Sequence, residues 1–150
     1  VIDAPCSIAP DSVDKEVDLG EVTTAVINAN KKSTPVAVDI NLQNCVLSDP
    51  DDETATPITK VEVTFSSTAT YASDTSLLSN TYASGAENVG VRLLDNDEAN
   101  ITLGSAKTVD LLPNSDTQTL HFKARMEVPT GTTATAGQVE ANANYVLMYK

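Results

Sequence analysis

Several residue types are scarce or missing in this sequence of 150 residues, and each shortage argues against a class of protein. Tryptophan is absent, histidine occurs once and cysteine twice. Lys and Arg number 9 against 21 Asp and Glu, which gives a net charge of -12. Because binding to phosphate backbones and to anionic lipid surfaces depends on clusters of Lys and Arg, this balance argues against nucleic-acid binding and peripheral membrane attachment.

Long apolar runs and catalytic motifs are missing as well. No stretch approaches the roughly 20 residues that a membrane helix needs, so we expect no direct membrane insertion. The six glycines are scattered and form no phosphate-binding loop, and no G-x-S-x-G motif is present. His121 lies on the outward face of a predicted strand, and Arg92 and Lys107 are isolated bases; we expect all three to be solvated. The sequence therefore indicates neither an enzyme nor a zinc or cofactor site.

The abundant residues favour β-structure. The sequence contains 19 Thr and 12 Ser, and the β-branched Thr and Val suit a pleated surface better than a helix. Apolar residues make up 41%, enough for a packed core, so we expect a single domain over residues 1–150. The sequence begins without Met and without a signal peptide, from which we expect a mature or trimmed chain.

Four segments alternate apolar and polar residues with the two-residue period of a half-buried strand. They are residues 36–43, 60–66, 119–126 and 138–150, and shorter candidates are 16–22, 89–94, 101–103 and 108–112. We interpret 48–57 and 130–137 as loops and 75–82 as a helical turn, whereas the Val and Thr content of 22–30 argues against a helix there. About eight short strands with polar connections predict an all-β sandwich.

Two further features could stabilise the fold or bind a metal ion. Cys6 and Cys45 are the one possible cysteine pair, and a Thr-rich, acidic β-protein is typical of secretion, where a bridge persists; two unrelated buried thiols are the alternative. The acidic runs 49–53 and 95–98 offer the oxygen ligands that Ca²⁺ prefers. Neither run has the spacing of an EF-hand loop, and acidic turns are common at strand ends.

The last segment has an unusual inward face, with small Ala141 and Ala143 followed by large Tyr145, Leu147 and Tyr149. Small residues in the middle of a core strand leave room that another side chain must fill. The simplest explanation is an ordinary sandwich in which neighbouring strands fill this room. The alternative is a core that stays open at this strand.

Six segments and the C-terminal pattern together form a specific signature. The segments are VIDAPCSI (1–8), VDLG (17–20), INLQNC (40–45), NVGVRLLD (88–95), FKAR (122–125) and ANANY (141–145). Gly137 is the fourteenth residue from the end, Tyr149 is penultimate, and alternating apolar residues lie between them. Taken over the whole chain, this signature resembles the subunits of chaperone–usher fimbriae, above all the major pilins of type 1 and P pili.

The resemblance implies an incomplete immunoglobulin-like β-sandwich that lacks its last strand and is completed by a donor strand in trans. A periplasmic chaperone would lend that strand first, and the N-terminal extension of a neighbouring subunit would replace it at the outer-membrane usher. The family's disulfide matches Cys6 and Cys45, and its C-terminal carboxylate, held by basic residues of the chaperone, is here on Lys150. The family's donor extension would precede the segment that matches Val1–Cys6, so we expect this chain as written to accept a strand but not to donate one.

We expect the last segment and the first strand to line the groove that receives the donor. The expected lining residues are Ile2, Ala4, Ile8, Val139, Ala141, Ala143, Tyr145, Leu147 and Tyr149.

The sequence thus predicts a structural subunit of an extracellular fimbria that forms a homopolymer by donor-strand exchange and catalyses nothing. A minor or terminating pilin of the same system is the alternative within this fold. A calcium-dependent extracellular binding module, built on one of the two acidic runs, is the alternative from another class. An enzyme is third, and no feature of the sequence argues for it.

Overall fold

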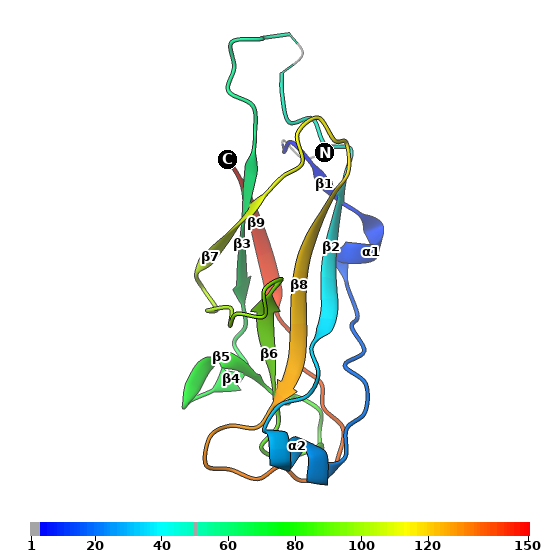
Figure 1. Ribbon diagram of the computed structural model, residues 1–150, viewed down its shortest axis with the longest axis vertical. Helices are drawn as coiled ribbons and strands as arrows, with labels where there is room; N and C mark the ends of the chain where they lie inside the picture. Colours follow the sequence, from blue (N-terminus) through cyan, green and yellow to red (C-terminus); the bar gives the residue numbers. More distant parts are fainter. Residues whose placement is uncertain (1–3, 50) are drawn as a thin grey trace.

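The alternating segments of the sequence pair into two antiparallel sheets (Figure 1), in a computed structural model that describes residues 4–49 and 51–150. Within these residues, one sheet has six strands in the order β1-β2-β8-β6-β5-β4, and the other has three in the order β7-β3-β9. The larger sheet comprises β1 (Ser7–Ile8), β2 (Val36–Gln43), β4 (Thr70–Tyr71), β5 (Asp74–Ser79), β6 (Gly90–Asp95) and β8 (Gln118–Glu127). The smaller comprises β3 (Lys60–Ser66), β7 (Ala106–Asp110) and β9 (Asn144–Tyr149).

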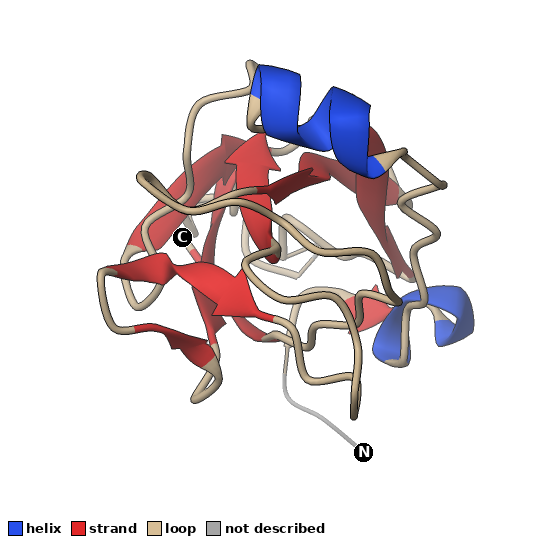
Figure 2. Cartoon of the chain, turned by 90° about the horizontal axis from the view of Figure 1, so that it is seen from below, coloured by secondary structure: helices blue, strands red, loops and turns tan. Residues whose placement is uncertain are grey.

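Two short helices lie outside the sheets. Helix α1 (Pro10–Val13) directly follows β1 and contacts β2, and helix α2 (Thr24–Asn30) lies at one end of the sandwich, as Figure 2 shows from that end. No helix among the described residues is long and apolar enough to span a membrane. The two β-sheets therefore form the fold, and the helices are peripheral, as the sequence predicts.

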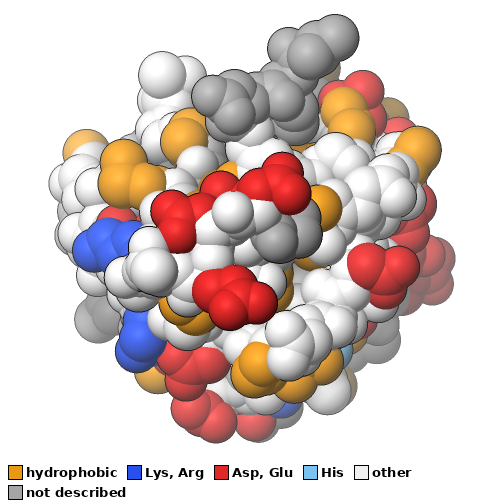
Figure 3. Space-filling view, turned by 90° about the horizontal axis from the view of Figure 1, so that it is seen from above, with side chains coloured by type: hydrophobic (Ala, Val, Ile, Leu, Met, Phe, Trp, Pro, Cys, Tyr) orange, Lys and Arg blue, Asp and Glu red, His pale blue; other side chains and the backbone are white. Residues whose placement is uncertain are grey.

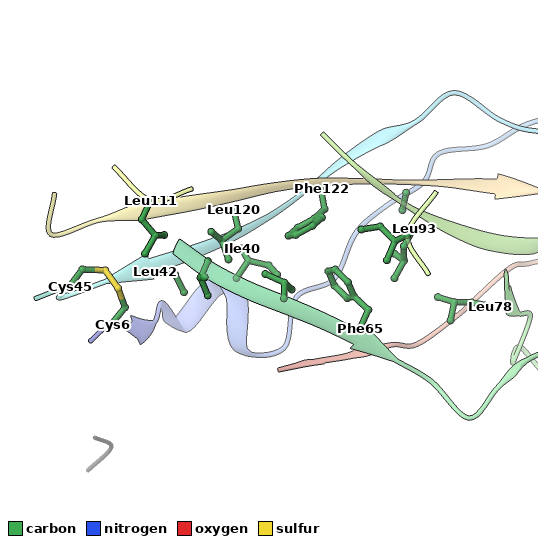
Figure 4. Close-up of a cluster of buried hydrophobic side chains, with 14 of the residues drawn as sticks. Cys6, Ile40, Leu42, Cys45, Phe65, Leu78, Leu93, Leu111, Leu120 and Phe122 are labelled. Carbon is green, nitrogen blue, oxygen red and sulfur yellow. A yellow bond between two sulfur atoms is a disulfide. The ribbon is translucent and has the colours of Figure 1, made fainter. Parts of the chain in front are cut away.

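The core lies between the two sheets and consists of the inward-facing residues of the central strands. Phe65 of β3 and Phe122 of β8 meet edge to face with 5.0 Å between ring centroids, in the middle of the cluster that Figure 4 shows. Ile40 and Leu120 are cross-strand partners in the pairing of β2 with β8. This register places the apolar face of each alternating segment on the inside, so the pattern in 36–43, 60–66 and 119–126 correctly predicted both strand and face.

Two local predictions were wrong. Residues 24–30 form helix α2, because Thr23 caps it by accepting the N–H of Val26 at 3.3 Å and Lys31 closes it in a left-handed conformation at φ 63°. Side-chain capping therefore outweighs the low helix propensity of Val and Thr. The expected helical turn at 75–82 is instead covered largely by strand β5. Its consecutive Leu77 and Leu78 are both buried, so the two-residue alternation that marks a strand is missing.

Other segments differ from the prediction in extent. Residues 16–22 and 101–103 are not in strands, although Ile101 is buried. Only 144–149 of the long segment 138–150 belong to a ladder. The expected loops at 48–57 and 130–137 are irregular, with Pro50 outside the described residues.

Arg92 is buried rather than solvated, which corrects the sequence-based expectation. Its guanidinium binds Asp74 at 2.5 Å and Glu127 at 2.9 Å, and Arg125 binds Glu127 as well. The hydrogen bond from Arg92 lowers the pKa of Asp74. Burial opposes ionisation of Glu127, but the two arginines outweigh it and lower the pKa of Glu127 also. Strand pairing, which the sequence does not display, brings these charges together across β5, β6 and β8.

The disulfide between Cys6 and Cys45 fastens β1 to the chain just after β2, as the sequence predicts. The two Cα atoms lie 4.1 Å apart, and the cysteines are 39 positions apart in the sequence. Because β1 contributes only two residues to the ladder with β2, few hydrogen bonds hold this first strand by themselves. The disulfide therefore reinforces the backbone hydrogen bonds that flank this ladder, from Val46 to Pro5 and from Ala9 to Asn41.

Removing the disulfide is expected to destabilise the protein strongly. In the chain-entropy model, closing a loop of this length contributes about 4 kcal/mol. The variant with Cys6→Ser and Cys45→Ser should lose stability of this order in urea unfolding. A reducing agent should reproduce the loss in the natural protein and leave the double variant unchanged; equal stability of both proteins would contradict the assigned role.

The ion pairs of Arg92 with Asp74 and Glu127 are expected to make the protein less stable in acid. Since the folded-state pKa values of Asp74 and Glu127 are depressed, their contribution is complete above about pH 4.5 and is lost as the pH falls through those lowered values. Asp74→Asn should therefore flatten the decline in unfolding free energy between pH 5 and pH 2. As a control, Asp110→Asn alters a carboxylate that is 83% exposed in its pair with Lys60 and should leave the slope unchanged.

Candidate functional site

The inward face of strand β9 is incompletely covered, although it belongs to the core. Its residues Tyr145, Leu147 and Tyr149 are each half-buried. Their ladder partners in β3 are Phe65, Val63 and Val61, which are 4%, 0% and 0% exposed. Neighbouring residues on one face of a sheet thus differ sharply in burial. The core is covered over β3 and open along β9, and we call these three β9 residues the apolar edge.

The opposite flank of the same sheet is built differently. Strand β7 places Lys107 opposite Val63, and the Lys107 amine pairs with Asp95 of the other sheet at 3.1 Å. Lys107 was expected to be solvated, and it is instead a half-exposed ion-pair partner. An inward-pointing charge is one of the devices that protect an edge strand from pairing with other chains. The apolar edge at β9 has three large apolar residues and no such charge.

The larger sheet is also open on the side of its β1–β2 flank. Ile8 of β1 and Val38 of β2 contact the core but remain half-buried, as does Leu19 in the connection that follows α1. By contrast, the inward residues Leu120, Phe122, Ala124 and Met126 of the neighbouring strand β8 are all buried. Incomplete burial therefore affects both sheets.

Backbone groups of β9 point toward the open side. Within residues 4–49 and 51–150, strand β9 pairs with β3 alone, and Lys150 exchanges hydrogen bonds with Lys60 at 2.9 Å and 3.0 Å. Since hydrogen-bonded pairs alternate along an antiparallel ladder, Met148 and Val146 also point their N–H and C=O toward β3. The N–H and C=O groups of the apolar edge point away from β3, and no described residue pairs with them. The edge thus offers both apolar side chains and unpaired backbone groups.

The chain before β9 is held by backbone hydrogen bonds from Thr81 to Glu140 and from Ala86 to Gln138, and by one amide side chain. Asn80, just after β5, donates to the backbone oxygens of Ala86 and Gln138 and accepts the N–H groups of Tyr82 and Glu140, all within 2.7–3.0 Å. Gly137 has φ 147°, and a Cβ there would lie 2.5 Å from the backbone nitrogen of Ala86. Glycine at this signature position therefore permits the close crossing from which β9 starts.

The structure brings most of the predicted groove residues to this side of the molecule. Val139, Ala141, Tyr145, Leu147, Tyr149 and Ile8 all contact the main core while remaining half-buried. Ala4 and Ala143 are exposed, and Ile2 lies outside the described residues. At the end of β9, the backbone oxygen of Lys150 accepts the N–H groups of Thr59 and Lys60, and its amine pairs with Glu62.

Sequence reasoning missed one residue of this region, Ser12 in α1. Its side chain is fully buried, and its carbonyl accepts the Tyr145 hydroxyl at 2.5 Å. The only local signal is the sequence Ala9-Pro10-Asp11-Ser12, since proline is favoured in the first turn of a helix. Burial raises the pKa of Tyr145, so the phenol stays a neutral donor across the ordinary pH range.

The acidic runs serve as turns. Figure 3 shows Asp and Glu side chains gathered at the end of the sandwich where residues 48–57 lie. Asp49 accepts the N–H of Asp51, and Asp95 accepts those of Asp97 and Ala99, so these carboxylates shape the backbone. Among the described residues, no group of three or more His, Cys, Asp or Glu is arranged to hold a metal ion. His121 is exposed and lies 3.0 Å from Asp39.

Comparison with known proteins agrees with this architecture. The profile of the family described as "Fimbrial protein" matches residues 1–150. The fimbrial-like protein YbgD of Escherichia coli K12 is 52% identical across all of this chain and 81% of its own length. The A chain of the type-1 fimbrial protein of the same organism is 37% identical across all of this chain and 79% of its own.

Solved structures show the same fold. The P pilus rod subunit PapA superposes with a TM-score of 0.80 over 98% of this chain and all of that chain, at 23% identity. A subunit in a chaperone–usher pilus superposes with a TM-score of 0.78 over all of this chain and 90% of that one, also at 23% identity.

The chain therefore belongs to the fimbrial protein family and has the immunoglobulin-like fold of chaperone–usher pilins. It is a structural subunit of an extracellular surface pilus, where its neighbours are other subunits, and it is not an enzyme.

Amide exchange along β9 is expected to alternate in the isolated subunit. The N–H groups of Tyr145, Leu147 and Tyr149 have no partner among the described residues, whereas those of Val146 and Met148 bond to β3. The first set should exchange faster by on the order of tenfold or more, as measured residue by residue by NMR. Uniform protection along β9 would show that its outer edge is already paired.

Proposed function

We propose that this subunit, acting as a single pilin domain, joins its neighbours by accepting a donor strand at the apolar edge of β9. The donor runs between β9 and β1 and becomes the missing strand of the sandwich. The observation that carries the proposal is the contrast between half-buried Tyr145, Leu147 and Tyr149 and their fully covered partners in β3. The lining of the groove is Ile8, Val139, Ala141, Tyr145, Leu147 and Tyr149, with Ala4 and Ala143 at its margins.

The energetics favour such a strand over any smaller ligand. A donor with about five alternating apolar side chains, each worth roughly 1.5–3 kcal/mol when fully buried, gains on the order of 8–15 kcal/mol. This gain is comparable to the entire net stability of an ordinary domain. The unpaired N–H and C=O groups of the apolar edge add main-chain hydrogen bonds, which give affinity without depending on the donor's sequence.

We extend the proposal to export. An exposed apolar edge invites pairing with other chains, so a periplasmic chaperone covers it with a strand of its own until the outer-membrane usher exchanges that strand for a subunit's extension. Lys150, at the end of β9, is the residue whose carboxylate the chaperone holds with basic side chains. The high acidity of the subunit, with a net charge of -12, supports a basic partner for this contact.

Peptide binding tests the proposal directly. The probe is a synthetic peptide in which about five valines alternate with threonines, and the control peptide has the same composition with the valines grouped together. With the alternating peptide at about 100 times its Kd, the melting temperature should rise by about 5–10 °C.

The two peptides distinguish strand insertion from non-specific hydrophobic binding. Only the alternating peptide should raise the melting temperature and protect the amides of Tyr145, Leu147 and Tyr149. An equal effect of both peptides, or no effect of either, would falsify the proposed groove.

A further inference from the structure

A hydrogen bond between a side chain and the backbone joins the apolar edge of β9 to helix α1. The Tyr145 hydroxyl, from β9 in the smaller sheet, donates to the backbone carbonyl of Ser12 in α1 at 2.5 Å. Helix α1 directly follows β1, which is the outermost strand of the larger sheet. This contact therefore spans the side of the sandwich where incomplete burial is concentrated.

The acceptor side of this contact is held firmly. Ser12 is fully buried, and its hydroxyl accepts the backbone N–H of Asn41 in β2 at 2.9 Å. The Asn41 amide donates to Asp11 at 3.0 Å and accepts the hydroxyl of Thr119 in β8 at 3.0 Å. Since β1 ends at Ile8, the Ser12 hydroxyl takes over the bond to β2 that a strand would have made. Helix α1 is thus anchored to β2 through Asn41, which is in turn bonded to β8.

The donor side is held by its strand and by packing against the core, where Phe65 is its aromatic neighbour. The Tyr145 ring is half-buried and lies 6.2 Å from the ring of Phe65, at a tilt of 58°. Its hydroxyl reaches away from this contact toward α1. The Tyr145 ring crosses the space between β9 and α1. A donor strand inserted there would need this space for the side chain that faces the core opposite Tyr145. Because α1 is anchored, the ring is the part that moves.

We infer that the Tyr145–Ser12 hydrogen bond is a latch that spans the empty groove and must break before a donor strand is seated. This inference rests on the proposed strand insertion and assigns Tyr145 as a positioning residue for it. The latch keeps β9 and α1 at a fixed separation in the empty subunit, and it resists filling of the groove. If the Tyr145–Ser12 hydrogen bond is absent from the filled state, it slows uptake of the donor strand and weakens binding of that strand by the same factor.

Tyr145→Phe isolates the latch, because it removes the hydroxyl and keeps the ring against Phe65. With the alternating valine peptide as probe, this variant should take up the peptide about fivefold faster and bind it with about fivefold lower Kd, the effect of losing one neutral hydrogen bond. The melting temperature of the empty variant should be lower than that of the natural protein, while the peptide-filled forms of the two should unfold with the same free energy.

Tyr71→Phe is the matched control. The Tyr71 hydroxyl also donates to a backbone carbonyl, that of Val89 at 3.1 Å, and it lies on β4 at the far end of the larger sheet. Its loss should lower the stability of the empty and filled forms equally and leave the uptake rate unchanged. If Tyr145→Phe behaves in the same way as Tyr71→Phe, the hydrogen bond is structural only and the latch is wrong. If the peptide fails to bind the natural protein and both variants, strand acceptance itself is wrong.

Discussion

The structure depends on one constraint at strand β9. Among the described residues this strand pairs on one flank, and its large apolar side chains face a core that it does not close. Strand β9 satisfies its hydrogen bonds toward β3 and leaves those of Tyr145, Leu147 and Tyr149 directed outward. In an ordinary sandwich the next strand of the same chain would cover these groups. Here no described strand does so, and the half-buried side chains and unpaired backbone groups lie along the same edge. The donor strand that we propose would cover the side chains and pair with the backbone groups at once.

Several other features hold this open edge in shape. The disulfide of Cys6 fixes β1, which has only a two-residue ladder, and Ser12 fixes the helix that follows it. Asn80 fixes the crossing from which β9 starts. On the other flank of the smaller sheet, the ion pair of Lys107 with Asp95 puts charge where β9 has apolar residues. The two edge strands of the smaller sheet thus differ: the charge on β7 disfavours pairing with another chain, and the apolar side chains of β9 favour it.

The sequence predicted these parts unevenly, for physical reasons. Alternation identified β2, β3 and β8 with the correct inward faces, because one side of each strand meets the core and the other meets solvent. It failed for β5, where Leu77 and Leu78 are buried on both faces, and for α2, where the cap at Thr23 outweighs propensity. It also failed for Arg92, since Asp74 and Glu127 become its neighbours only through the register of β5, β6 and β8. For the last strand, the row of small and large residues from Ala141 to Tyr149 was visible, but the residues alone left an ordinary sandwich and an open core equally possible, and only the family resemblance favoured the open core.

By itself, the sequence determined that the chain forms a β-sandwich, which residues of β2, β3 and β8 face its interior, which cysteines pair and which family of proteins it resembles. These properties follow from local periodicity and from residue types, which a linear chain displays directly. Only the tertiary structure decided that the inward face of β9 remains half-covered, and that Tyr145 reaches across to the carbonyl of Ser12, a residue 133 positions away. Burial and hydrogen bonding between distant segments depend on strand order and register, because the same apolar row would be fully enclosed if one more strand lay beside it.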